Sequence, residues 1–118
     1  MKTSFCTNVF NLNDMYHALE LLKNLGYDGV EFWDNYLVEA NINSLKKHLD
    51  KLELQVAQIC PYFDVTGSEE EVQNSLRISE KYVKLALSLG CKNIRTFTGE
   101  VSSSDADDNI YWQAVKAL

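Results

Sequence analysis

The sequence has few of the residues that typify disordered or repetitive chains, since one proline and five glycines occur among its 118 residues. Apolar residues make up 46 % and charged residues 24 % of the chain, which is the balance of a globular domain. Disorder, collagen-like repeats and low-complexity tracts are therefore excluded. We expect one globular, soluble unit whose core needs no disulfide or structural metal.

Positive charge is also scarce. Eleven lysines and arginines face 17 aspartates and glutamates, which gives a formal net charge of −6. Proteins that bind phosphate backbones or anionic membranes gain affinity from the opposite sign. We therefore expect neither nucleic acid nor a membrane as a partner.

The sequence also has few cysteines and no long apolar run. Cys6, Cys60 and Cys91 form no C-x-x-C pair and have no histidine at ligand spacing, so we interpret them as reduced core residues. The N-terminus becomes polar again at Thr7 before an apolar run reaches signal-peptide length. No later run approaches the roughly 20 apolar residues of a membrane span, and we expect a cytoplasmic protein.

Short apolar segments alternate with amphipathic ones along the whole chain. Contiguous or alternating apolar residues predict four strands, at residues 3–10, 29–33, 54–60 and 93–97. Apolar residues spaced by three or four predict four helices, at residues 12–25, 42–52, 68–90 and from 110 onward. The helix at residues 68–90 has the strongest end signals, because Ser68 and three glutamates lie at its start and Gly90 lies at its end.

This order of elements predicts an α/β fold. Strands that alternate with helices need crossover connections, which give a parallel sheet with outer helices. Four βα units are half of a (β/α)8 TIM barrel, which has about 250 residues. We therefore expect residues 1–118 to form a single (βα)4 half-barrel. The alternative is an open doubly wound sheet, against which residues 7–11 offer no glycine-rich phosphate loop.

The last helical pattern reaches residue 118 without a stop signal, so the chain looks truncated within its fourth helix. Two interpretations follow: the sequence is the N-terminal part of a longer protein, or two copies close one barrel. A homodimer would cover exposed sheet edges that otherwise invite association.

Two segments that lead into strands resemble each other, at residues 25–32 and 89–96. Each has a Leu-Gly helix end, a short turn, and then an aliphatic residue beside a charged one. Alternate strands of a barrel contribute to the same interior layer, so Glu31 and Arg95 are expected at one level of the interior. They can contact substrate there or form a buried ion pair with each other, and the two roles are compatible.

Five further residues near the predicted strand ends are candidates for substrate binding. Trp33 and Phe97 share strand faces with Glu31 and Arg95, where aromatic rings can pack against a sugar. The other three follow the first and third strands and can bind hydroxyl groups: Asn8, Tyr62 and Asp64. Core packing of the rings, and turn formation by Asn8 and Asp64, are the structural alternatives.

Four motifs together resemble the xylose-isomerase-like TIM barrels. They are Lys-Thr-Ser-Phe-Cys-Thr-Asn at 2–8, Leu-x-x-Leu-Gly-Tyr-Asp-Gly-Val-Glu at 22–31, Pro-Tyr-Phe-Asp at 61–64 and Leu-Ser-Leu-Gly-Cys-Lys-Asn-Ile-Arg at 87–95. The resemblance covers essentially the whole chain, and its strongest part is the turn at residues 26–31. That superfamily includes sugar isomerases and epimerases, a dehydratase and AP endonucleases.

The resemblance implies a metal-dependent sugar or sugar phosphate isomerase or epimerase. In such enzymes two Glu, an Asp and a His of the second half of the barrel hold Mn, Mg, Co or Zn, while a carboxylate moves a proton through an enediolate. This chain resembles the first half, so we expect it to shape the pocket for a small sugar or cyclitol. We expect it to bind no metal, since His17 and His48 fall inside predicted helices, and to be inactive alone.

Two other functions stay open at this point. One is a non-catalytic half-barrel that self-assembles as a binding module. The other is the AP-endonuclease branch, which the acidic charge balance disfavours.

Overall fold

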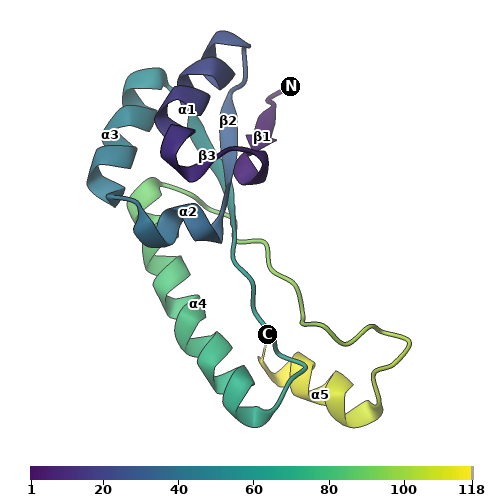
Figure 1. The fold of residues 1–118 in the computed structure, drawn as a ribbon. Helices are drawn as coiled ribbons and strands as arrows, with labels where there is room; N and C mark the ends of the chain where they lie inside the picture. Colours follow the sequence, from purple (N-terminus) through teal and green to yellow (C-terminus); the bar gives the residue numbers. More distant parts are fainter. Residues whose placement is uncertain (118) are drawn as a thin grey trace.

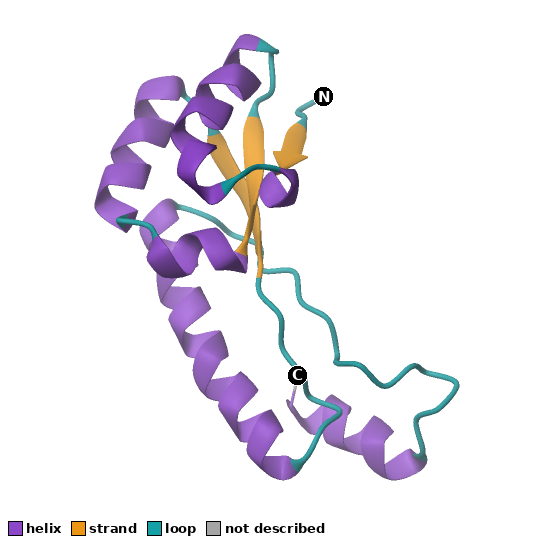
Figure 2. Ribbon diagram, in the orientation of Figure 1, coloured by secondary structure: helices purple, strands orange, loops and turns teal. Residues whose placement is uncertain are grey.

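The computed structural model describes residues 1–117 as a three-stranded parallel sheet with helices between the strands. The elements are β1 (Ser4–Cys6), the 3₁₀ turns η1 (Thr7–Val9) and η2 (Leu12–Asp14), α1 (Met15–Asn24), β2 (Gly29–Trp33), α2 (Asp34–Glu39), α3 (Ile42–Leu52), β3 (Gln55–Cys60), α4 (Glu69–Leu89) and α5 (Asp108–Ala117). Helices α1 and α3 lie along one side of the sheet, and α4 extends away from it toward α5 (Figures 1 and 2). None of the helices within residues 1–117 combines the length and apolarity needed to cross a membrane.

The central strand is β2, which pairs in parallel with β1 on one side and with β3 on the other. The register places Glu31 between Cys6 of β1 and Gln58 of β3, and Trp33 opposite Cys60. This arrangement confirms the α/β class and the parallel sheet with outer helices, which is the arrangement of βα units in part of a TIM barrel.

Residues on β2 alternate between two environments. Val30 and Phe32 are completely buried with Leu19 of α1 and Leu45 of α3, so they form the core between sheet and helices. Successive side chains of a strand point to opposite faces. Glu31 and Trp33 therefore lie on the face opposite this core, where both are partly exposed.

The expected fourth strand, at residues 93–97, is reduced to one bridge between Ile59 and Ile94. Ile59 N–H donates to the carbonyl of Asn93 (3.1 Å), and Arg95 N–H donates to the carbonyl of Ile59 (2.9 Å). The next donor of a parallel ladder would be residue 61, which is a proline without an N–H. The pairing stops there, and this segment leaves the sheet.

The first strand is shorter than the sequence predicts, whereas the helix at residues 42–52 has the predicted extent. The first strand ends at Cys6, because residues 7–9 turn into η1, where the Thr7 hydroxyl donates to the carbonyl of Glu31 (3.0 Å). Helix α3 has the predicted bounds, and it is capped by Asn41, whose side chain accepts from the N–H of Ser44 (3.0 Å). The short helix α2 was not expected at all.

Helix α4 has the ends that the sequence predicts. The Ser68 hydroxyl accepts from Glu71 N–H (3.4 Å), while the Glu71 carboxylate accepts from Ser68 N–H (2.7 Å), which completes a capping box. Hydrogen bonds from the hydroxyl and N–H of Ser68 hold the pKa of Glu71 below its usual value. Gly90 ends the helix with a left-handed φ of 69°.

Candidate functional site

Three aromatic side chains gather where β2 and β3 end. Trp33, the last residue of β2, meets Tyr62 edge to face with ring centroids 5.1 Å apart. Tyr62 in turn stacks on Phe97 at 5.1 Å with an interplanar angle of 15°. Tyr62 and Phe97 remain 56 % and 43 % exposed. These three rings, which we call the aromatic platform, therefore offer an apolar surface at the carboxyl ends of the strands.

Arg95 continues this platform. Its guanidinium carbon lies 5.5 Å from the centroid of the Phe97 ring, within the range of a cation–π contact. The backbone of Arg95 is held by its N–H bond to the carbonyl of Ile59. The structure thus brings together four of the seven predicted site residues in one row.

Glu31 does not form the expected ion pair with Arg95. Its Oε1 accepts from the Ser4 hydroxyl of β1 (2.7 Å), and its Oε2 accepts from the Gln58 side-chain amide of β3 (2.6 Å). Among the side chains that the structure describes, no carboxylate lies at salt-bridge distance from the Arg95 guanidinium. The ion-pair prediction was wrong because the neighbouring strands supply two uncharged donors, which satisfy both oxygens of this half-buried carboxylate.

Asp64 builds the turn after β3. Its Oδ1 accepts from the N–H of Thr66 (2.8 Å), the hydroxyl of Thr66 (2.8 Å) and the N–H of Gly67 (3.0 Å). Burial raises the pKa of this carboxyl, but the donors of Thr66 and Gly67 outweigh burial and hold the pKa below its usual value. Gly99 packs so closely on this turn, at a φ of 140°, that a Cβ would collide with the Asp64 carboxylate.

Asn8 lies in η1, directly after β1, with an exposed side chain. Asn8 and Asp64 therefore stand on the turns that follow the two outer strands, while Glu31 lies on the same strand face as Trp33. All seven predicted residues lie on that strand face or at the carboxyl-end side of the sheet. Their role in substrate binding stays a prediction.

Four residues of this region were missed by the sequence reasoning. Ser4 and Gln58 hold Glu31, and their only signal is their position on the strand faces that flank it. Cys60 is buried beside Arg95; burial raises the pKa of its thiol, and the arginine charge only partly opposes this. Gln113 of α5 donates to the carbonyls of the turn after β3, at Val65 (3.2 Å) and Gly67 (2.7 Å), and no local pattern signals this contact.

Among the described side chains, no three His, Cys, Asp or Glu residues come together as a group that could hold a metal ion. Both Glu31 oxygens are engaged by Ser4 and Gln58, as described above. His48 of α3 contacts Tyr16 edge to face and has its Nε2 3.9 Å from Glu20, on the helix side of the sheet. These residues do not fit a divalent ion.

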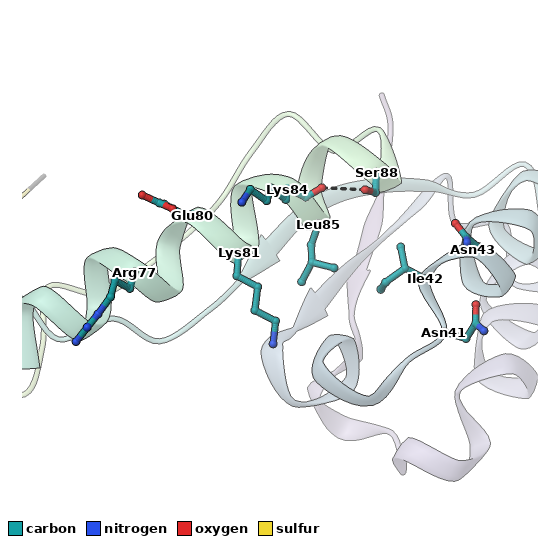
Figure 3. Close-up of a pocket in the computed structure, with 9 residues that line it drawn as sticks. All are labelled: Asn41, Ile42, Asn43, Arg77, Glu80, Lys81, Lys84, Leu85 and Ser88. Carbon is teal, nitrogen blue, oxygen red and sulfur yellow. Dashed lines mark hydrogen bonds between the residues drawn. The ribbon is translucent and has the colours of Figure 1, made fainter.

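Two cavities lie away from the platform. The first, of about 490 Å³, lies between the start of α3 and α4, where Ile42 and Leu85 face each other (Figure 3). Its lining also includes three cationic residues of α4: Arg77, Lys81 and Lys84. The second, of about 510 Å³, includes Lys2 and Asp28 near the amino ends of the strands. TIM-barrel sites lie at the carboxyl ends, so the platform remains the candidate site.

The sequence comparison agrees with this architecture, because residues 19–118 match the family model described as xylose isomerase-like TIM barrel. The chain belongs to the xylose isomerase-like TIM barrel family. No curated protein sequence matches it significantly.

Solved structures share the xylose isomerase-like TIM barrel fold with this chain. The probable 3-DHS dehydratase of Bacillus anthracis has a TM-score of 0.79 and 23 % identity over 98 % of this chain and 45 % of its own. The 3-keto-D-glucoside 4-epimerase of E. coli has a TM-score of 0.75 and 23 % identity, over 99 % of this chain and 49 % of its own. The D-psicose 3-epimerase of Clostridium cellulolyticum H10, solved with D-tagatose, has a TM-score of 0.81 and 14 % identity, over 99 % of this chain and 46 % of its own. The chain thus spans just under half the length of these proteins.

Proposed function

We propose that this chain is the N-terminal, substrate-binding half of a sugar or cyclitol isomerase or epimerase. The aromatic platform carries the proposal. Apolar faces of sugar rings pack against aromatic side chains, and Tyr62 and Phe97 expose large fractions of theirs at the carboxyl-end side of the sheet. The substrates in the names of the two epimerases with the same fold support a ligand of this size.

Polar groups around the platform would bind the hydroxyls of such a ligand. We assign this role to the Asn8 amide, the Tyr62 hydroxyl and the Asp64 oxygen that does not accept from the turn. Both carboxylate oxygens of Glu31 already accept hydrogen bonds from β1 and β3. We therefore treat Glu31 as a positioning residue that joins the three strands two residues before Trp33. The Arg95 guanidinium is the remaining polar group beside the platform.

The reaction class that we propose is proton transfer beside a carbonyl group through an enediolate. The family resemblance implies a base and a divalent metal ion for this chemistry. The described side chains include no group of three His, Cys, Asp or Glu residues that could hold the ion by themselves. We therefore assign to this chain substrate binding alone, in a cytoplasmic enzyme whose chemistry depends on residues outside it.

Deuterium incorporation tests this proposal. The full-length protein is incubated in D2O with Mn or Mg and a panel of aldoses, ketoses and keto-cyclitols, and exchange of carbon-bound hydrogen is followed by NMR. We expect exchange for at least one compound and a loss of about fivefold to tenfold in kcat/KM for Tyr62→Leu, since an aromatic contact contributes about 1 kcal/mol.

Tyr111→Leu is the matched control, because Tyr111 of α5 is 57 % exposed and lies outside the platform. It should leave kcat/KM unchanged. No exchange with any compound, or equal losses for Tyr62→Leu and Tyr111→Leu, would overturn the proposal.

A non-catalytic half-barrel that assembles through its sheet edges is the second candidate. It is favoured by β1, whose outer edge pairs with no strand within residues 1–117. A native mass equal to two copies of the 118-residue chain, together with no deuterium exchange, would favour this candidate.

A further inference from the structure

Arg95 combines an exposed position with a fixed orientation. Its backbone is tied to β3 through Ile59, and its guanidinium lies over the Phe97 ring, next to the ring stack of the platform. A flexible surface arginine would lack both restraints. The donors of this guanidinium therefore project beside a surface that fits a ring-shaped ligand.

The charge of Arg95 is not neutralised by its surroundings. Both oxygens of Glu31, the carboxylate expected to pair with it, accept from Ser4 and Gln58, and no other carboxylate whose side chain is described reaches salt-bridge distance. The neighbouring Cys60 is a buried thiol whose raised pKa keeps it uncharged.

A guanidinium presents its donors in a planar fork that matches carboxylate and phosphate oxygens. We propose that Arg95 is the anion-binding residue of this site, so that the substrate is a sugar or cyclitol that carries a carboxylate or phosphate beside the ring on the platform. This inference rests on the proposed function and specifies its substrate class. It also gives an acidic protein the local cation that an anionic ligand requires.

Isothermal titration of the full-length protein with three probes of one ring scaffold tests the proposal. The probes are myo-inositol, which is neutral, myo-inositol 1-phosphate, and the carboxylate quinate. We expect at least one anionic probe to bind about tenfold or more tightly than myo-inositol, which is typical of a charge-assisted contact. Comparing myo-inositol 1-phosphate with quinate then shows whether the site prefers a phosphate or a carboxylate.

Arg95→Met removes the charge and keeps an apolar stem of similar length. It should reduce the anionic preference, measured as the ratio of the affinity for the anionic probe to that for myo-inositol, to less than about twofold, and Arg95→Lys should retain an intermediate preference. The control is Arg77→Met on α4, which lowers the net charge equally at a distant cavity and should keep the full preference.

The outcomes separate this inference from the function on which it rests. Equal binding of all three probes, or an anionic preference that survives Arg95→Met or is lost equally in Arg77→Met, would overturn the role of Arg95 alone. Myo-inositol binding that Tyr62→Leu does not weaken would contradict the platform itself. Failure of every probe to bind would overturn both.

Discussion

Replacing Glu31 with alanine removes two hydrogen bonds that join all three strands of the sheet. The carboxylate accepts from Ser4 on β1 at 2.7 Å and from Gln58 on β3 at 2.6 Å. A hydrogen bond to a charged group contributes about 1.5–3 kcal/mol when buried. Because this site is half-buried, water replaces part of each bond, and we expect Glu31→Ala to lower the free energy of unfolding by about 2–3 kcal/mol.

Urea unfolding of the full-length protein, followed by circular dichroism, measures this loss. Arg95→Ala should cost less than about 0.5 kcal/mol, since surface substitutions without a buried partner rarely cost more. In a double-mutant cycle, the coupling energy between Glu31 and Arg95 should stay below about 0.5 kcal/mol, while Glu31 and Gln58 should be coupled by about 1 kcal/mol.

An ion pair would give the opposite pattern. A coupling energy above about 1.5 kcal/mol between Glu31 and Arg95, with little coupling to Gln58, would refute the reasoning. That result would also remove the argument that Arg95 is available to a ligand.

Two further perturbations test the turn after β3. Gly99→Ala should cost at least about 2 kcal/mol in urea, because it adds a Cβ that collides with the Asp64 carboxylate to the strain of a positive φ. Gly26→Ala, also at a positive φ but with no atom within 4 Å of the new Cβ, should cost only about 1 kcal/mol, and equal losses would contradict this account. Asp64 also predicts a pH dependence of stability, because its pKa is lower in the folded than in the unfolded state. The stability that its ionised carboxylate contributes is fully present above the pKa of the unfolded state and is lost as the pH falls through the pKa of the folded state. The thermal midpoint should fall below about pH 4 and fall less for Asp64→Asn; identical profiles would show that the turn does not hold this carboxylate.

The elements that the sequence predicts well are those defined by local signals. The strand at residues 29–33 and the helices at 42–52 and 69–89 have apolar residues at the spacing of their own type, and the longest helix also has Ser68 and Gly90 at its ends. The aromatic platform was predictable in part, because Trp33 and Phe97 follow Glu31 and Arg95 by two residues and parallel strands bring their ends together.

Contacts between strands are harder to predict. The fourth strand is lost because Pro61, which directly follows the partner strand β3, lacks the N–H that would be the next donor of the ladder. This effect depends on the register between segments that are distant in the sequence. The same holds for Glu31, whose charge alone favours an arginine partner. Ser4 and Gln58 are adequate donors only once the register places them on either side of it.

Fluorine NMR of the full-length protein labelled with 5-fluorotryptophan tests the central claim most directly. Trp33 lies in the platform and Trp112 lies 57 % exposed on α5, so the second ring is an internal control, and Trp→Phe variants assign both signals. Titration with myo-inositol and D-fructose should shift the Trp33 signal in a saturable way and leave that of Trp112 in place. A Trp33 signal that stays unchanged with every polyol, or one that shifts only together with Trp112, would contradict a sugar-binding site at the carboxyl ends of these strands.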